Sequence, residues 1–369
     1  MNAPGGPQAE TPTTAPAPWQ PPPARIAVFR ALQLGDMLCA MPALRALRRA
    51  APAAHITLVG LPGAASIVQR FHGELDALLP FPGLPGMPEQ APDADGWGEF
   101  TRRARAARFD LAIQLHGDGR ITNRVLPALA ARRTAGFVPQ GTSPPSPDFL
   151  AWPDELPEVL RYTALMEHLG IAVADTGLHI PLEPEDTAEC DALLETCGLT
   201  PSRTVLLHPG ARLASRRWAP ARFAAVGRRL ARAGYQLAIT GSPDEALITG
   251  ELKHRLGVPA HDLTGRTSLG GLAALVQRCA LVVCNDTGMS HVAAAMRTPS
   301  VVIASGSDVH RWAPLDRQRH RVLWHDLPCR PCAHAACPYP GHPCASAVDP
   351  GTVAHAALLQ LGHGERRHA

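Results

Sequence analysis

Lysine is nearly missing from this chain of 369 residues. Lys253 is the only lysine among 35 basic residues, so the cationic chemistry is almost entirely that of guanidinium groups. An excess of one charge is missing as well, because 32 acidic residues leave a net charge of only +3. This balance disfavours a dedicated nucleic-acid-binding protein. The chain also has no run of the roughly 18 apolar residues that a membrane-spanning helix needs.

Three common cofactor and nucleotide signatures are absent too. No G-x-G-x-x-G follows either of the first strands expected below, which disfavours a nicotinamide or flavin enzyme. No G-x-x-x-x-G-K-[ST] loop occurs anywhere. No Asp-x-Asp pair stands at the end of an expected strand, which disfavours a metal-dependent transferase.

The first 24 residues are low in aliphatic side chains and hold eight prolines. Such a segment buries too little apolar surface to offset the entropy of ordering, so we expect residues 1–24 to form a flexible tail. The tail lacks the basic start and apolar stretch of a secretory signal, and we therefore expect a cytoplasmic protein.

The rest of the chain has the composition of a packed protein, with 46% hydrophobic and 18% charged residues, and its length suggests two domains. Strand-like and helix-like segments alternate in two series, separated by a break at 197–202. The first series is expected at 25–30 (strand), 37–50 (helix), 55–59 (strand), 98–108 (helix), 111–115 (strand), 119–131 (helix), 139–157 (loop) and 158–169 (helix). The second is expected at 204–208 (strand), 220–233 (helix), 235–240 (strand), 244–256 (helix), 268–278 (helix), 281–284 (strand), 289–296 (helix) and 300–304 (strand).

Repeated strand–helix–strand units predict an α/β protein with parallel sheets covered by helices. We expect two Rossmann-like domains facing a central cleft, an N-terminal one over 25–198 and a C-terminal one over 199–369. Ligands of such sheets bind outside the carboxyl ends of the strands, so the loops at those ends are the places to search for chemistry.

The loop Gln33-Leu34-Gly35-Asp36 follows the first strand. An aspartate here is commonly an N-cap that stabilises a helix by about 1 kcal/mol. In a crevice, Asp36 can instead act as a general base that takes a proton from an attacking hydroxyl.

The loop from His208 to Trp218 opens the second series. Small residues such as Gly210 let backbone amides approach an anion, and Arg216 or Arg217 can add a bidentate phosphate contact. The alternative is that these arginines, Arg212 included, form a solvated approach to the next helix.

Two further strand ends carry a glycine turn. Glu245 follows Gly241 and can accept hydrogen bonds from ribose hydroxyls or an adenine amine, although an exposed acid favoured by the helix dipole is the simpler explanation. Gly265 precedes Thr267 at a similar turn on the same edge.

The most distinctive loop is Asn285-Asp286-Thr287-Gly288-Met289-Ser290-His291, which ends a strand and opens a helix. The Thr287 hydroxyl and the amides of Gly288 and Met289 would point at whatever occupies the helix N-terminus, a geometry that favours phosphate. His291, one turn further, either faces the same ligand or packs against the sheet.

Nine cysteines in a long cytoplasmic chain argue against a disulfide framework. Five are scattered and fit the role of small buried hydrophobes. The other four, Cys329, Cys332, Cys337 and Cys344, lie close together in the sequence with His334 and His342 between them. This segment, the Cys-rich loop 329–344, is either a surface loop with reduced thiols or a structural zinc site.

Several of these blocks together resemble glycosyltransferase family 9, the bacterial lipopolysaccharide heptosyltransferases, in their order and spacing over about residues 25–325. The matching blocks are Leu34-Gly35-Asp36-Met37 with Met41–Leu47, His208-Pro209-Gly210 with Arg216-Arg217-Trp218, Gly241 with Glu245, Leu263-Thr264-Gly265 with Ser268-Leu269, and Asn285–His291 with Ala293-Ala294-Ala295. The family commonly has lysine where this chain has Arg216, which keeps the charge but not the point-like ammonium.

The resemblance implies a GT-B fold and an inverting, metal-independent transfer of heptose from ADP-heptose to a lipopolysaccharide-core acceptor. It implies that Asp36 and Arg216 are catalytic, as base and as stabiliser of the leaving diphosphate. The donor-binding residues would be His208, Gly210, Arg217, Glu245, Thr267, Asp286, Thr287, Gly288, Met289 and His291. No cofactor would be required for catalysis, and zinc would have a structural role only. The alternatives are another nucleotide-sugar or acceptor, or a catalytically silent nucleotide-binding module with a zinc loop.

Residues 101–133 hold eight arginines against two aspartates. Such a surface is usually just solvated. An anionic glycolipid acceptor at the cytoplasmic face of the inner membrane would nevertheless be drawn to it, which makes peripheral membrane contact an expectation for this domain.

Overall fold

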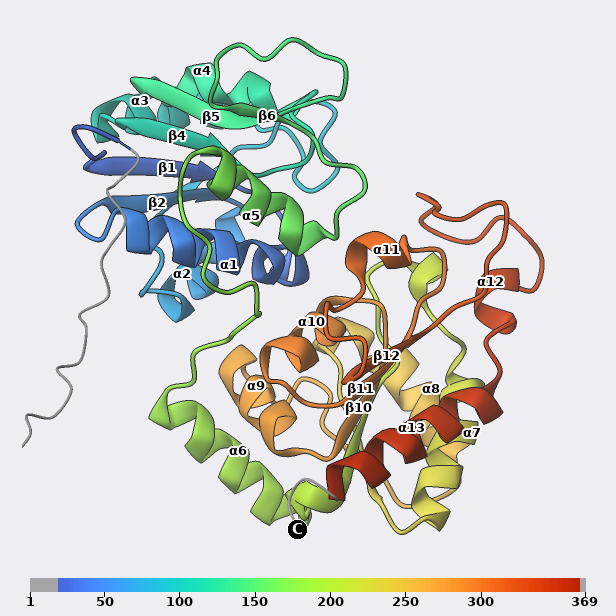
Figure 1. The fold of residues 1–369 in the computed structure, drawn as a ribbon. Helices are drawn as coiled ribbons and strands as arrows, with labels where there is room; N and C mark the ends of the chain where they lie inside the picture. The colour runs from blue at the N-terminus through green and yellow to red at the C-terminus, as the bar shows by residue number, and fades with distance from the viewer. Residues whose placement is uncertain (1–18, 366–369) are drawn as a thin grey trace, which may run out of the picture.

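The protein is described by a computed structural model over residues 19–365, with side chains through residue 362. The chain forms two lobes, each built on a six-stranded parallel sheet with helices on its faces (Figure 1). The α/β fold with two Rossmann-like lobes is the one that the sequence predicts. The strand orders are β3-β2-β1-β4-β5-β6 in the N-terminal lobe and β12-β11-β10-β7-β8-β9 in the C-terminal lobe.

The strands of the N-terminal lobe are β1 (Arg25–Phe29), β2 (His55–Gly60), β3 (Ala77–Pro80), β4 (Leu111–Gln114), β5 (Arg133–Val138) and β6 (Phe149–Ala151). Its helices are α1 (Leu34–Ala50), α2 (Ala65–Arg70), α3 (Gly96–Ala107), α4 (Leu126–Leu129) and α5 (Glu158–His168), with short 3₁₀ turns at Pro62–Ala64 and Thr122–Val125. The central strands β1 and β4 are mostly apolar and are buried except at Arg25, because helices cover both faces of the sheet.

The strands of the C-terminal lobe are β7 (Thr204–His208), β8 (Gln236–Ile239), β9 (His261–Asp262), β10 (Leu281–Asn285), β11 (Ser300–Ile303) and β12 (His320–Leu323). Its helices are α7 (Pro220–Arg232), α8 (Ala246–Leu256), α9 (Leu269–Arg278), α10 (Gly288–Ala295), α11 (Val309–Trp312), α12 (Pro343–Ser346) and α13 (Pro350–Glu365). Short 3₁₀ turns lie at Pro201–Arg203, Ala214–Arg216 and Pro243–Glu245.

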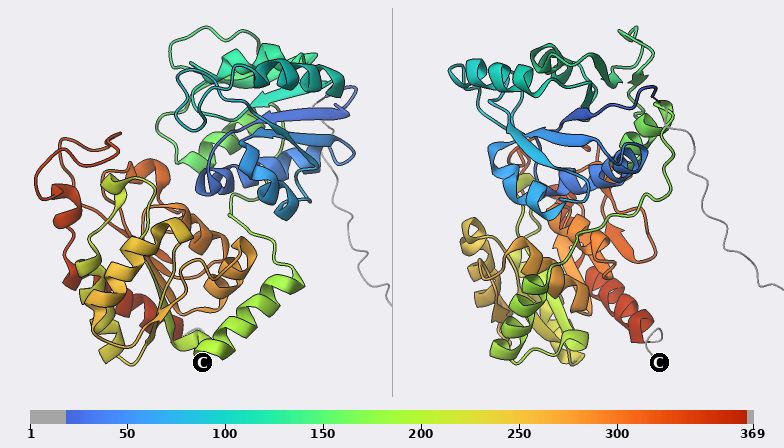
Figure 2. Two further views of the ribbon diagram at one scale, coloured as in Figure 1. Left: turned by 180° about the vertical axis from the view of Figure 1, so that it is seen from behind. Right: turned by 90° about the vertical axis from the view of Figure 1, so that its left-hand side faces the viewer.

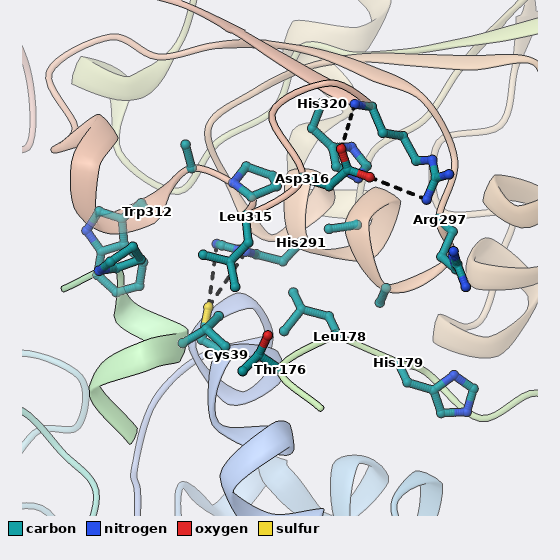
Figure 3. Close-up of a pocket in the computed structure, with 18 of the residues that line it drawn as sticks. Cys39, Thr176, Leu178, His179, His291, Arg297, Trp312, Leu315, Asp316 and His320 are labelled. Atoms are coloured by element: carbon teal, nitrogen blue, oxygen red, sulfur yellow. Dashed lines mark hydrogen bonds and ion pairs between the residues drawn. The ribbon is translucent and has the colours of Figure 1, made fainter. Parts of the chain in front are cut away.

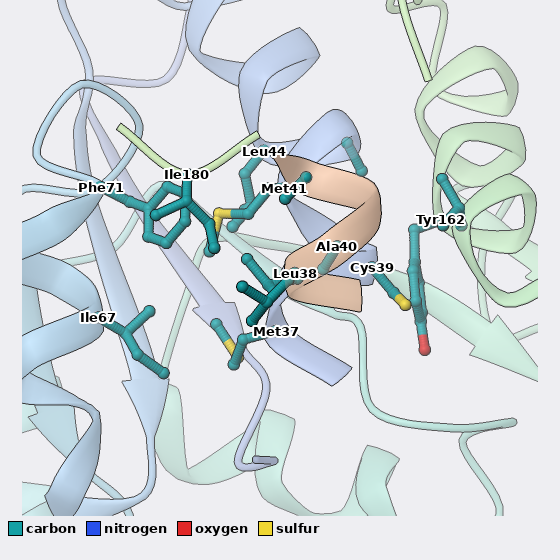
Figure 4. Close-up of a cluster of buried hydrophobic side chains, with 14 of the residues drawn as sticks. Met37, Leu38, Cys39, Ala40, Met41, Leu44, Ile67, Phe71, Tyr162 and Ile180 are labelled. Atoms are coloured by element: carbon teal, nitrogen blue, oxygen red, sulfur yellow. The ribbon is translucent and has the colours of Figure 1, made fainter. Parts of the chain in front are cut away.

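Helix α1 is buried on nearly every side, because it packs against α5 in its own lobe and against α10 of the other lobe. Figure 4 shows this arrangement: Met41 and Leu44 lie near Phe71 and Ile180, while Cys39 lies near Tyr162. These side chains belong to one continuous hydrophobic cluster that reaches from the N-terminal lobe through α10 into the C-terminal lobe. The two lobes therefore meet through the helix that begins beside Asp36.

The helix expected at 119–131 is wrong. The structure has only a 3₁₀ turn and the four-residue α4 there. Gly119 has a φ of +85°, and a Cβ on it would lie 2.1 Å from the Phe137 carbonyl oxygen, so the backbone cannot be helical at that point. The left-handed Ala130 ends the segment.

Other boundaries differ from the expectations. The expected loop 139–157 contains the edge strand β6, and β3 was not expected at all. Most of the expected tail, residues 1–18, lies outside the described residues. Trp19 is buried in the hydrophobic cluster, so residues 19–24 do not continue the expected tail.

The connection between the lobes runs from α5 down to α6 (Pro184–Cys197), as both views of Figure 2 show. Although α6 precedes the boundary expected at residue 198, it packs against α9 of the C-terminal lobe. Arg70 of α2 reaches across and pairs with Asp186 of α6. Within residues 19–365, no helix is long and apolar enough to cross a membrane.

Candidate functional site

A cavity of about 840 Å³ lies between the lobes, where loops at the carboxyl ends of both sheets meet. We call this space the front cavity. The structure brings most of the predicted site residues to its wall. They are Asp36, His208, Arg216, Glu245, Thr267, Asp286, Thr287, Gly288, Met289 and His291. Residues separated by up to 255 positions in the sequence therefore share one space.

Asp36 lies in the first turn of α1, half-buried in the cavity wall. The side chain of Arg30, at the end of β1, donates from Nε to the main-chain oxygen of Asp36 over 3.0 Å. Burial raises the pKa of the Asp36 carboxyl above its ordinary value, and the positive charge of Arg30 opposes that rise. A carboxylate made more basic in this way is better suited to accept a proton near neutral pH.

The two lobes touch directly beside Asp36. A Cβ on Gly35 would lie 3.0 Å from the Cα of Gly288 and 3.0 Å from Cδ2 of His291. Glycine is therefore needed at position 35 for α1 and α10 to approach so closely. We call this contact the lobe seam. It places Asp36 and the N-terminus of α10 in the same cavity.

The N-terminus of α10 presents groups that find no partner among residues 19–362. The amides of Gly288 and Met289 lie in the first helical turn, where no intrahelical acceptor exists. The Thr287 hydroxyl is buried and finds no hydrogen-bond partner among the described residues. These donors at the positive end of a helix dipole suit a phosphate group.

His291 is buried one turn into α10, where Nδ1 lies 3.7 Å from the Cys39 sulfur across the seam. Burial lowers the pKa of His291, which favours the neutral ring. The ring also packs edge-on against Trp312, with centroids 6.4 Å apart. His291 thus belongs to the contact between the lobes as well as to the cavity wall.

Arg216 enters the cavity from the 3₁₀ turn after β7 and is held by main-chain carbonyls. It donates to the Ser305 oxygen over 3.2 Å and to the Cys332 oxygen over 2.6 Å. Burial lowers the pKa of Arg216, but a guanidinium stays protonated throughout the working range of a protein.

The Cys-rich loop 329–344 supports this turn at several points. Ser215 donates its amide to the Ala335 oxygen over 3.0 Å and its hydroxyl to the His334 oxygen over 2.5 Å, and His342 Nε2 lies 3.0 Å from the Ser215 oxygen. The loop therefore fixes the backbone from which Arg216 extends.

Glu245 and the glycine turns form the opposite end of the cavity. The Glu245 carboxylate accepts the Ser242 amide over 2.9 Å and lies 3.9 Å from His208 Nε2. A Cβ on Gly210 would meet the Glu245 carboxylate at 2.0 Å, so glycine at 210 makes room for that acid. Gly210 itself does not appear in the cavity wall.

Arg217 is the predicted donor-binding residue that the structure places elsewhere. Its Nε donates to the Ala211 carbonyl over 2.8 Å, and its side chain is not part of the cavity wall. Arg216 is the last residue of the 3₁₀ turn and Arg217 has extended backbone, and the two side chains are bound by different carbonyl groups.

The four cysteines of the Cys-rich loop are free thiols in the structure. In the part of the chain that the structure describes, no three His, Cys, Asp or Glu side chains gather closely enough to hold a metal ion. The arrangement of the thiols therefore does not fit a tetrahedral zinc site as it stands.

Sequence reasoning missed several residues around the cavity. Ser307 lines it with a buried hydroxyl that has no partner among the described residues. Asn285, at the end of β10, connects this strand end to the loop after β7. Its Oδ1 accepts a hydrogen bond from the Trp218 amide, and its Nδ2 donates to the Pro209 oxygen. Arg30 lies at the buried end of the first strand. A charged residue is unusual there, and this was the one feature of the sequence that could have pointed to Arg30.

A second cavity of about 600 Å³ lies on the other side of the seam (Figure 3). This rear cavity shares His291 and Trp312 with the front one and also involves Cys39 and the linker at residues 175–179. Leu315 and Asp316 approach from the segment after α11. This rear cavity was not predicted from the sequence.

Comparison with known proteins agrees with the fold. The family model described as glycosyltransferase family 9 (heptosyltransferase) matches residues 97–342. Lipooligosaccharide heptosyltransferase 2 of Campylobacter jejuni is 26% identical over 163 residues, which are 42% of this chain and 51% of that protein. The chain thus matches only about half the length of this curated relative.

Two solved structures resemble the whole chain. A family 9 glycosyl transferase from Veillonella parvula superposes with a TM-score of 0.75 at 24% identity and covers 92% of this chain and 98% of its own. ADP-heptose lps heptosyltransferase II of Escherichia coli gives a TM-score of 0.69 at 20% identity, with 92% and 99% covered. At these identities the likeness establishes the GT-B type of fold, and the family model, which spans most of the chain, establishes the relationship. The chain belongs to glycosyltransferase family 9, the heptosyltransferases.

Proposed function

We propose that this protein transfers a heptose from ADP-heptose to a lipopolysaccharide-core acceptor, with inversion at the anomeric carbon and without a catalytic metal. The observation that carries the proposal is the lobe seam, which puts a carboxylate of raised pKa and the unpaired donors of α10 in one cavity. The names of the relatives support heptose transfer, and that of the Escherichia coli enzyme supports ADP-heptose as donor.

The proposed reaction is a single displacement. Asp36 accepts the proton of the acceptor hydroxyl as that oxygen attacks the anomeric carbon. The bond from this carbon to the phosphate oxygen breaks, and its electron pair stays on the departing ADP. The positive charge of Arg216 and the amides at Gly288 and Met289 stabilise the negative charge that develops on the diphosphate. Direct attack from the opposite side inverts the configuration.

The remaining cavity residues are assigned to the nucleoside. Glu245 accepts hydrogen bonds from the ribose hydroxyls, because the Ser242 amide is the one hydrogen-bond donor that its carboxylate has among the described residues. Thr267 lies in the same wall and is assigned to the adenine side. His208, near Glu245, has a pKa lowered by burial and therefore meets the donor as a neutral ring.

Asp36→Asn tests the assignment of the base. The amide has the size of the carboxylate but cannot take a proton, so kcat should fall by about a hundredfold to ten-thousandfold while ADP still binds. Release of ADP from ADP-heptose in the presence of a core acceptor measures turnover, and calorimetry with ADP measures binding. Asp95→Asn, at an exposed aspartate whose side chain makes no cap, is the matched control.

Wild-type turnover in Asp36→Asn would rule out the base. A screen of purified nucleotide-sugars tests the donor in the same assay. Release of UDP rather than ADP would show another donor, and tight ADP binding with no transfer to any acceptor would show a catalytically silent module.

Zinc is proposed only as a structural ion of the Cys-rich loop. The four thiols lie near the turn that carries Arg216, but closing a tetrahedron would require the loop to rearrange, because no three ligands gather in the described structure. The test is elemental analysis of the purified protein. One zinc per chain supports a structural site, and less than a tenth of an equivalent after purification without chelator argues for reduced thiols.

The acceptor is proposed to be an anionic glycolipid met at a membrane surface. Of the eight arginines over 101–133, all are exposed at the surface of the N-terminal lobe, and four pair with nearby acids. The other four, Arg103, Arg105, Arg108 and Arg124, make no ion pair among the described residues. Sedimentation with vesicles containing anionic lipid, compared with neutral vesicles, tests this contact; equal binding to both would contradict it.

A further inference from the structure

Glu158, the first residue of α5, is an acid buried to 1% exposure. Burying a carboxylate is costly unless charged partners and hydrogen bonds compensate for its lost hydration. Glu158 has three partners: Arg311, Arg161 and the hydroxyl of Tyr162, which donates to Oε1. Such a concentration of charge in an interior points to a role beyond packing.

The strongest of these contacts joins the two lobes. Arg311 belongs to α11 of the C-terminal lobe, and its guanidinium donates to both oxygens of Glu158, from Nε over 2.6 Å and from Nη2 over 3.0 Å. The same guanidinium lies 4.5 Å from the Trp312 ring centroid. Separating the lobes would leave the Glu158 carboxylate without this bidentate partner, so the pair favours the approach of the lobes seen here.

The other contacts of Glu158 extend toward Asp36, the proposed base. Tyr162, which donates to Glu158, lies with its ring 4.3 Å from the guanidinium carbon of Arg30. Arg30 in turn donates to the main-chain oxygen of Asp36. Glu158, Tyr162 and Arg30 are buried. Together with the partly exposed Arg311, they form an unbroken path of contacts from α11 to the first turn of α1.

We propose that Glu158 is a positioning residue that links the approach of the two lobes to the placement and charge of Asp36. This inference rests on the proposed role of Asp36 as base. When Arg311 is seated, Glu158 holds Tyr162 and Arg30 in the positions from which Arg30 anchors the Asp36 backbone. When the lobes part, Glu158 loses its cationic partner from the other lobe and keeps Arg161 of its own helix.

Asp36 also senses these charges through space. The groups that face it are Arg30 from β1, Glu158 from α5, His291 from α10 and Arg311 from α11. Glu158 raises the pKa of Asp36, whereas Arg30 and Arg311 lower it. Glu89 also lies close enough to interact with Asp36. Removing either member of the Glu158–Arg311 pair must therefore move the titration of Asp36, in opposite directions.

The experiment measures kcat against pH with ADP-heptose for Arg311→Gln, Arg311→Lys and Glu158→Gln. Turnover requires ionised Asp36, so the acidic limb of the profile reports its pKa in the substrate complex. Arg311→Gln should move this limb to higher pH by up to about one unit, and kcat should fall about tenfold as the base loses its fixed position. Glu158→Gln should move the limb to lower pH.

Arg311→Lys is the matched control for charge. It keeps the cation but not the two-pronged contact, so the limb should stay near its wild-type position while kcat falls. ADP affinity should change by less than about threefold in the Arg311 variants, because Arg311 is not in the wall of the front cavity. This readout separates a positioning effect from loss of the nucleotide site.

The proposal is overturned if Arg311→Gln retains the wild-type kcat and pH profile, or if both neutral variants move the limb in the same direction. Should Glu158→Gln fail to fold, the two Arg311 variants still decide the matter. Full turnover in Asp36→Asn would instead reject the base itself, so failure of the proposed function is distinguishable from failure of the link through Glu158.

Discussion

The two walls of the front cavity are built in different ways. The N-terminal lobe contributes one acid, Asp36, embedded in charged side chains whose contacts continue to Glu158. The C-terminal lobe contributes helix amides, hydroxyls without partners and an arginine held by main-chain carbonyls. The difference supports the proposed division of roles, in which Asp36 of the N-terminal wall accepts a proton and the C-terminal wall binds the diphosphate.

Arg216→Ala should give the largest effect on the C-terminal wall. Removing the cation that is proposed to stabilise the leaving diphosphate should lower kcat/KM by about a hundredfold to a thousandfold. Arg217→Ala provides the comparison, since its side chain braces the Ala211 carbonyl outside the cavity and should cost far less. Steady-state kinetics with varied ADP-heptose measures both. Equal losses in the two variants would contradict the different roles of these neighbours.

Each lobe also buries a histidine whose pKa is strongly lowered, which makes stability depend on pH. Burial lowers the pKa of His116, after β4, to about 3 and that of His320, in β12, to about 4. Below pH 6.5 the unfolded chain binds protons that the folded chain excludes, so stability present above this pH is lost as the pH falls. At pH 5 the loss should be roughly 2 kcal/mol for each histidine.

Urea unfolding at pH 7.5 and pH 5 measures this loss. His320→Gln should lack its share of the pH dependence, whereas His254→Gln, at an exposed position of α8, should keep all of it. Identical pH dependence in the two variants would count against the buried histidine as its source.

Gly35→Ala tests the seam between the two walls. The added methyl would meet Gly288 and His291 at 3.0 Å, so the lobes must separate by a few tenths of an ångström. Such a displacement between base and donor should lower kcat by about tenfold, with ADP affinity nearly unchanged. Gly63→Ala, whose methyl meets nothing within 4 Å, is the control. A fully active Gly35→Ala enzyme would mean that the seam does not set the reacting distance.

Glu245→Gln should have the smallest effect, and chiefly on binding. A neutral amide accepts hydrogen bonds from ribose less strongly than a carboxylate does, so KM for the donor should rise about fivefold with little change in kcat. Glu251→Gln, which loses only an exposed pair with Arg255, is the matched variant. A fall in kcat at constant KM would assign Glu245 to the reaction rather than to the nucleoside.

The sequence was informative where the chain is locally regular. Buried runs such as Thr204–His208 gave the central strands, and glycine turns before helices marked the loops that line the cavity. The 3₁₀ turn and the short α4 were wrongly predicted as one helix over 119–131. The left-handed conformation of Gly119 depends on its contact with the carbonyl of Phe137, which is distant in the sequence.

The remaining features depend on contacts that leave no local pattern. Glu158 and Arg311 are 153 residues apart, and each reads as an ordinary helix-terminal charge in the sequence. The support that the Cys-rich loop gives to Arg216 spans 116 residues and uses main-chain oxygens, which no side-chain motif encodes. The contacts between residues of the two lobes depend on the packing of α1 on α10, which only the three-dimensional structure shows.

The contact between Gly35 and Gly288 separates two spaces, one of about 840 Å³ and one of about 600 Å³. If the lobes rotate about this contact, the front cavity widens as the rear cavity narrows, and the reverse. Opening of the front cavity would then narrow the rear cavity, whose wall includes Trp312 and Leu315. The side chains that line the rear cavity would therefore limit how far the front cavity can open.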